Sequence, residues 1–67
     1  MKHKPVVVGA LVQVRDDREL VSPDVGKRGV VMDILRANHF YERRAVLRIT
    51  NDYRTVIATR FLDVIDR

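Results

Sequence analysis

The residues best suited to chemistry lie in one segment, residues 36–44, which holds two of the four aromatic residues and three arginines. Phe40 and Tyr41 are adjacent in its middle, and Arg43 and Arg44 follow closely. Aromatic rings stack on unpaired bases, while guanidinium groups neutralise phosphates and also stack. The segment is therefore a candidate contact surface for nucleic acid. In the alternative, structural interpretation, Phe40 or Tyr41 caps one end of the fold and the arginines only keep a small protein in solution.

A second basic pair, Lys27 and Arg28, stands between Gly26 and Gly29. A phosphate-binding loop needs a longer glycine segment, a following Ser or Thr and a helix behind it, and these are missing. We therefore expect a tight turn with two exposed cations that can contact a nucleic-acid backbone. The residues predicted to contact nucleic acid are Lys27, Arg28, Arg36, His39, Phe40, Tyr41, Arg43 and Arg44.

Other reactive groups are few and scattered. The chain has no cysteine, which excludes disulfides, thiolate catalysis and cysteine-rich zinc sites. His3 and His39 are the two histidines, too few for a metal site without several carboxylates, so we expect both to be exposed. The carboxylates of residues 16–19 alternate with arginines in a polar loop, where neutralisation is expected rather than acid–base work. Ser22 has no neighbouring base. We predict no catalytic residue, no metal and no cofactor.

The elements that must position these residues are strands, because twelve Val, four Ile and three Thr give a β-branched composition. Residues 6–15 alternate, with the apolar even positions predicted to face inward and a bend at Gly9. Further strands are predicted over residues 29–35, 45–50, 54–58 and 62–65, with a long loop over 16–27 and a brief turn over 59–61. Leu20 or Val25 should tuck under that loop. A turn at Asn51–Asp52 would place Arg48 opposite Arg54, both pointing outward.

Residues 33–48 allow two interpretations. Ile34, Ala37, Tyr41 and Ala45 also fit one stripe of a helix, so a helix remains an alternative to a pair of strands joined by a loop. Asn38–His39 in the middle and the β-branched flanks favour the strands. In either case no linker or repeat divides the chain, which predicts one domain over residues 1–67 with a flexible N-terminus over residues 1–5.

Five short strands, a long first loop and a one-turn 3-10 helix before the last strand describe an all-β, SH3-like barrel. The pattern Gly9-x-x-Val12-x-Val14, with Gly26-Lys27-x-Gly29-x-Val31-x-x-Ile34, resembles the KOW motif of ribosomal proteins and transcription elongation factors. The resemblance implies nucleic-acid binding. It also implies that the loop over 36–44 lies near Lys27 and Arg28 and forms one basic face with them.

The same architecture is similar to type II dihydrofolate reductases, which carry a Val-Gln-Ile-Tyr segment shortly before the closing strand. This chain has Arg54-Thr55-Val56-Ile57 there, without the glutamine and tyrosine, so their activity is not expected.

The sequence thus predicts a small, basic, non-catalytic domain that binds RNA or DNA, although a net charge of +4 is a weak excess for such a protein. The alternative is a protein-binding adaptor or accessory factor, of the size found in phages and mobile elements, acting through the same loop or a sheet edge. No apolar run approaches the roughly 20 residues that cross a bilayer. The lack of cysteine favours the cytoplasm, and the small core leaves a homo-oligomer open.

Overall fold

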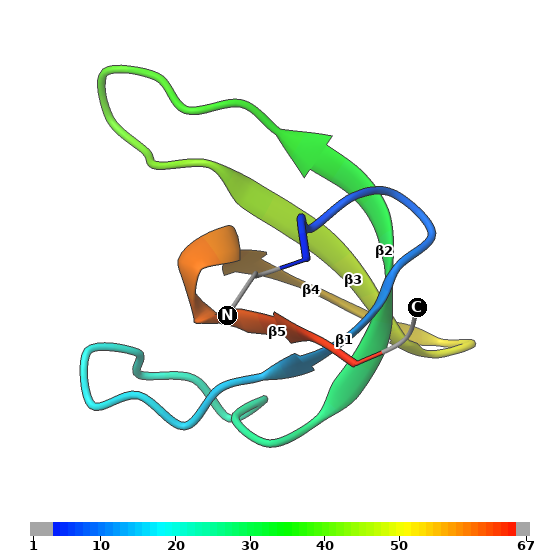
Figure 1. Cartoon of the computed structure of the whole chain (residues 1–67). Coiled ribbons are helices and arrows are strands. Elements are labelled where there is room, and N and C mark those ends of the chain that lie inside the picture. The colour runs from blue at the N-terminus through cyan, green and yellow to red at the C-terminus, as the bar shows by residue number, and fades with distance from the viewer. Residues whose placement is uncertain (1–3, 66–67) are drawn as a thin grey trace.

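The computed structural model describes residues 4–65 and folds them into one antiparallel sheet of five strands (Figure 1). The strands are β1 (Leu11–Val14), β2 (Arg28–Leu35), β3 (Arg44–Thr50), β4 (Tyr53–Ala58) and β5 (Leu62–Val64). A 3-10 turn, η1 (Thr59–Phe61), connects β4 to β5. The prediction of an all-β fold with five strands, a long first loop and a helical turn before the last strand is therefore confirmed.

The strands lie in the order β4-β3-β2-β1-β5, so the last strand returns to pair with the first. Val12 is opposite Val64 and Val14 is opposite Leu62, and the backbone N–H of Arg15 donates to the carbonyl of Phe61 at 2.7 Å. The other pairings join neighbours in sequence. The sheet therefore has β4 and β5 as its edge strands, and η1 connects them.

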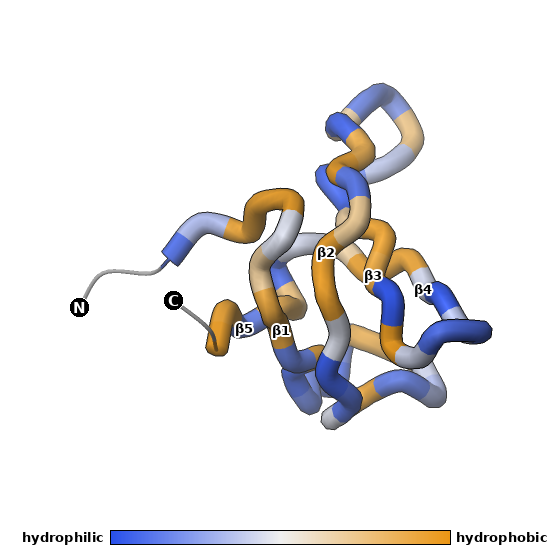
Figure 2. Tube along the Cα trace, turned by 90° about the vertical axis from the view of Figure 1, so that its right-hand side faces the viewer, coloured by the Kyte–Doolittle hydropathy of each residue, from blue (hydrophilic) through white to orange (hydrophobic). Residues whose placement is uncertain are grey.

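The core is built by alternation along the strands. Val12 and Val14 of β1 and Ala45 and Leu47 of β3 face inward and are at most 1% exposed. Burial alternates along β2 and β3, as expected when one face of a sheet is buried, and hydrophobic segments run through the strands in Figure 2. The remaining buried apolar side chains are Val6, Val31, Ile57, Phe61 and Leu62.

The first predicted strand is too long. Only Leu11–Val14 pairs as β1, while residues 7–10 form a turn in which the N–H of Ala10 donates to the carbonyl of Val7 at 3.1 Å. Gly9 supplies the left-handed conformation of that turn, with φ of +93°, which a side chain would strain. The inward-facing prediction holds for Val6, Val12 and Val14 but is wrong for Val8, which is 60% exposed because the turn rotates it away from the core.

The remaining element predictions are largely confirmed. Residues 33–48 form the end of β2, a loop and the start of β3, so the helix alternative is wrong. Leu20 and Val25 are both partly buried against the core under the β1–β2 loop. Asn51 and Asp52 form the predicted turn. Residues 1–3 of the predicted flexible N-terminus lie outside the described residues, and so does His3.

Candidate functional site

The β2–β3 loop, residues 36–43, projects away from the rest of the sheet (Figures 1 and 2). Asn38 organises its tip: its side-chain Oδ1 accepts the N–H of Phe40 at 2.8 Å and that of Tyr41 at 2.9 Å, and its own N–H donates to the carbonyl of Tyr41 at 2.8 Å. These three bonds form a closed turn. The loop therefore presents its aromatic residues from a backbone fixed by hydrogen bonds.

The aromatic side chains of this loop face water. Phe40 is 87% exposed and Tyr41 is 58% exposed, so neither caps an end of the sheet as the structural interpretation required. His39 is also exposed and meets the ring of Phe40 edge-on, with centroids 6.4 Å apart. The fold makes no use of the Phe40 ring in its core.

The three arginines of residues 36–44 differ in the contacts that their side chains make within the protein. The guanidinium of Arg44 lies 4.5 Å from the centroid of the Tyr41 ring, a cation–π stack, while its Nε is buried without an acceptor among the described residues. Arg43 donates to the backbone carbonyl of Val6 at 3.2 Å and so ties the N-terminal segment to the loop. The guanidinium of Arg36 makes no hydrogen bond or ion pair with another described residue and is exposed.

Lys27 and Arg28 do not join this loop. They stand at the start of β2, where Arg28 pairs with Gln13, whereas the loop leaves the other end of β2, where Leu35 pairs with Arg44. The prediction that the loop lies near Lys27 and Arg28 is therefore wrong, because β2 is a single strand that holds the two segments at its opposite ends. The ammonium group of Lys27 also has partners within the protein. Its Nζ lies 3.4 Å from the carboxylate of Asp24 and 5.3 Å from the centroid of the Tyr53 ring.

Asp24 is a buried carboxylate that sequence reasoning did not identify. It is 2% exposed, and the hydroxyl of Tyr53 donates to its two oxygens at 2.7 and 2.9 Å. Burial opposes ionisation, but hydrogen bonds from Tyr53, Thr55 and Lys27 outweigh it and hold the pKa of Asp24 below its ordinary value. Its hydrogen bonds from Tyr53 and Thr55 of β4 attach the β1–β2 loop to that strand, which is a structural role. The only signal in the sequence was the turn chemistry of Ser22-Pro23-Asp24.

Two carboxylates of the β1–β2 loop, Asp17 and Glu19, make contacts within the protein. The Oδ1 of Asp17 accepts the N–H of Glu19 at 2.8 Å. Arg60 of η1 then pairs with Glu19 at 2.9 Å and with Glu42 of the β2–β3 loop at 2.8 Å. These two hydrogen bonds raise the pKa of Arg60 above its ordinary value.

No group of three or more potential metal ligands occurs within residues 4–65. Helical structure in the same range is too short to cross a bilayer.

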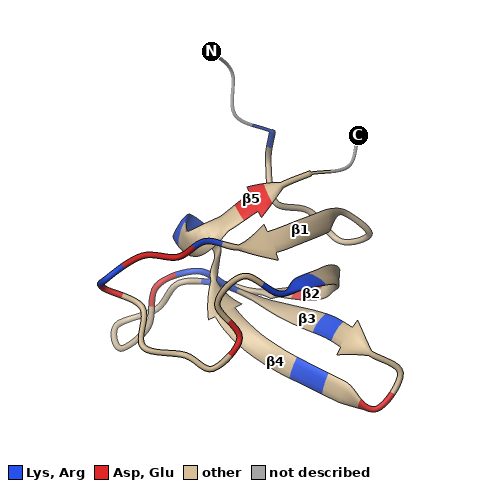
Figure 3. Ribbon diagram, turned by 90° about the horizontal axis from the view of Figure 1, so that it is seen from below, with Lys and Arg blue, Asp and Glu red and all other residues tan. Residues whose placement is uncertain are grey.

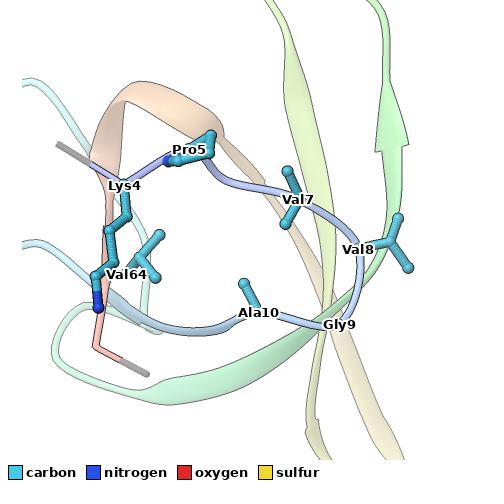
Figure 4. A pocket seen from close by; sticks show the side chains of 7 residues that line it. All are labelled: Lys4, Pro5, Val7, Val8, Gly9, Ala10 and Val64. Atoms are coloured by element: carbon cyan, nitrogen blue, oxygen red, sulfur yellow. The ribbon is translucent and has the colours of Figure 1, made fainter. Parts of the chain in front are cut away.

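A shallow groove of about 440 Å³ lies between the N-terminal segment, the start of β1 and β5 (Figure 4). Its lining is mainly apolar, with one ammonium group: Lys4, Pro5, Val7, Val8, Gly9, Ala10 and Val64. The described lining contains no hydroxyl, carboxylate or imidazole group, and Lys4 is its one ionisable side chain.

The outer face of the sheet carries the predicted arginine pair. Arg48 and Arg54 are directly opposite one another on β3 and β4, and both are exposed, which confirms that prediction. Figure 3 shows a basic position on each of the neighbouring strands β3 and β4.

Comparisons of the chain with protein-family models, with curated proteins and with solved structures gave no match.

Proposed function

We propose that this protein binds single-stranded RNA or DNA without catalysis, through the β2–β3 loop. The observation that carries the proposal is the exposure of Phe40, 87%, on a loop whose backbone is closed by the three hydrogen bonds of Asn38. Ordering a loop costs conformational entropy. In this loop the ordered backbone presents an aromatic ring, Phe40, that does not pack in the core.

The neighbouring groups suit the same ligand. Phe40 and Tyr41 offer flat surfaces on which unpaired bases stack, and each such stack contributes about 1–3 kcal/mol. Arg36 lacks an intramolecular partner among the described residues, and the guanidinium of Arg44 is held over Tyr41 at 4.5 Å. Stacking requires unpaired bases, so the proposal is for single strands rather than duplexes.

The strand order and the position of η1 support an SH3-like barrel as the architecture, and the resemblance to KOW domains stays a prediction. Arg28 and Lys27 are not part of the proposed loop site, since β2 separates them from it. The absence of cysteine supports a cytoplasmic location.

The test is a titration of fluorescently labelled RNA and DNA oligonucleotides at low salt, followed by anisotropy. Phe40→Ala should weaken binding by about tenfold, from the loss of one stack. Val21→Ala is the matched control, because Val21 is 97% exposed in a different loop and its loss also removes an exposed apolar group. Equal binding by the Phe40→Ala and Val21→Ala variants would refute the loop site, and no binding by the wild-type protein would refute the function.

A second candidate function, a protein-binding adaptor, rests on the edge strand β4. This strand pairs on one side only, with β3, and Val56 on it is 46% exposed. An open edge can accept a strand from a partner. Capture of partners from lysate with and without nuclease separates the two functions: a partner that survives nuclease and is lost on Val56→Pro supports the adaptor.

A further inference from the structure

Three arginines lie on adjacent strands at one end of the outer face of the sheet. Arg48 of β3 and Arg54 of β4 are directly opposite in register, and Val30 of β2 is opposite Arg48 on its other side. Arg28 is two residues before Val30 and shares its face, because the intervening Gly29 is buried. We call Arg28, Arg48 and Arg54 the arginine row. Figure 3 shows basic positions on these three strands.

Nothing in the described chain neutralises the arginine row. The guanidinium groups of Arg28, Arg48 and Arg54 make no hydrogen bond or ion pair with another residue of 4–65. Directly opposed residues on one face have their Cβ atoms about 4.5–5.5 Å apart, and like charges at such positions are destabilising. Arg48 and Arg54 form such a like-charged pair. Asp33 of β2 is opposite Val46 on this face, and its Oδ1 accepts the N–H of Ile34 at 2.8 Å.

The arginine row is continuous with the loop site along β3. Ala45 and Leu47 point into the core, so Arg44, Val46 and Arg48 share the outer face. Arg44 stacks on Tyr41 at the loop end of the strand. Four residues farther along, a distance of about 13 Å at the rise of a strand, Arg48 begins the arginine row. Between them, Val46 is opposite Val56 of β4 and Asp33 of β2, so the path along β3 and β4 contains no acidic side chain, and Asp33 borders it on the β2 side.

We infer that the outer face of β2, β3 and β4 is a second contact surface for the same single strand. The bases stack on Phe40 and Tyr41, and the phosphates that follow pass along β3 to the arginine row. This inference rests on the proposed function. It adds the path of the nucleic-acid strand across the protein and the contact residues outside the loop. Phosphates neutralise the Arg48–Arg54 repulsion, which the fold leaves uncompensated.

The test compares two variants of equal net charge. Arg48→Gln/Arg54→Gln removes the centre of the arginine row, and Lys4→Gln/Arg18→Gln removes two exposed cations outside the loop and the row. For a dodecanucleotide, the loss of two phosphate contacts should reduce the magnitude of the slope of log K against log salt concentration by about 1.4. Near 0.1 M salt this change corresponds to binding that is about 25-fold weaker. The control double variant should change the slope by less than half of that. A tetranucleotide, which can occupy only the loop, should bind both variants alike.

The outcomes separate this inference from the function on which it rests. If the wild-type protein binds neither oligonucleotide, both are overturned. If the wild-type protein binds and Phe40→Ala weakens it, but both double variants show the same slope with the dodecanucleotide, the loop site stands and the second surface is overturned. Thermal unfolding of Arg48→Gln/Arg54→Gln checks its fold, and a midpoint at or above that of the wild type is expected because the repulsive pair is gone.

Discussion

The hydroxyl of Tyr53 lies 2.7 Å from one carboxylate oxygen of Asp24 and 2.9 Å from the other, across 29 positions of the chain. This contact attaches the β1–β2 loop to the start of β4. Asp24 is buried, so its charge depends on such donors rather than on water.

Tyr53→Phe should therefore destabilise the protein. The substitution removes one donor from a buried carboxylate, and hydrogen bonds to charged groups contribute about 1.5–3 kcal/mol. The measurement is the free energy of unfolding from a denaturant titration. Tyr41→Phe is the control, because Tyr41 is exposed and its hydroxyl makes no hydrogen bond with a described residue. Equal stabilities of the two variants would show that the Tyr53–Asp24 contact contributes nothing.

The same carboxylate predicts a dependence of stability on acid. The pKa of Asp24 is lowered in the folded protein from the ordinary value of 3.8. Its contribution is thus fully present above the unfolded pKa and is lost as the pH falls through 3.8 toward the lower, folded pKa. Unfolding free energies measured between about pH 6 and pH 2 should fall less steeply for Asp24→Asn than for the wild type. Identical pH slopes would mean that Asp24 is not stabilised in its charged form.

Gly29 is fixed by the close approach of β2 and β3. A Cβ placed there would lie 2.8 Å from Cδ1 of Ile49 and 2.9 Å from the backbone oxygen of Arg48. Because backbone cannot move aside as a side chain can, Gly29→Ala should cost about 1–3 kcal/mol of unfolding free energy. Adding Ile49→Val should recover only part of this loss, since the contact with the Arg48 carbonyl remains. Full recovery in the double variant would locate the clash in the Ile49 side chain alone.

Local patterns were sufficient for most of the fold. The alternation of Ala45, Leu47 and Ile49 placed β3 and its inward face, and Asn51–Asp52 marked the turn that sets Arg48 opposite Arg54. Over residues 7–10 the same alternation failed, because Val8 is exposed. A turn closed by the Ala10–Val7 hydrogen bond interrupts it, and an apolar run does not distinguish a strand from an exposed turn.

The candidate site was harder to predict because it depends on which segments meet. Phe40, Tyr41 and Arg44 are close in sequence, and their grouping was visible there. The distance between Lys27 and the β2–β3 loop follows from the length of β2, and the strand predicted over residues 29–35 already separates them. The expected proximity came from the resemblance to SH3-like barrels and not from the residues. Asp24 and Tyr53 are far apart in sequence, so neither residue alone indicates their contact.

Arg54→Glu should have opposite effects on stability and on binding. Glutamate at position 54 would be opposite Arg48 in register, replacing a repulsive cross-strand pair by an attractive one that contributes about 0.2–1 kcal/mol. The free energy of unfolding should rise by that order, while binding of a dodecanucleotide should weaken more than for Arg54→Gln, because the new carboxylate repels phosphate. Thermal or denaturant unfolding gives the first quantity and anisotropy gives the second. A variant that is stabilised yet binds as tightly as the wild type would show that the arginine row lies outside the nucleic-acid path, whereas a destabilised variant would show that the two side chains do not interact across the strands.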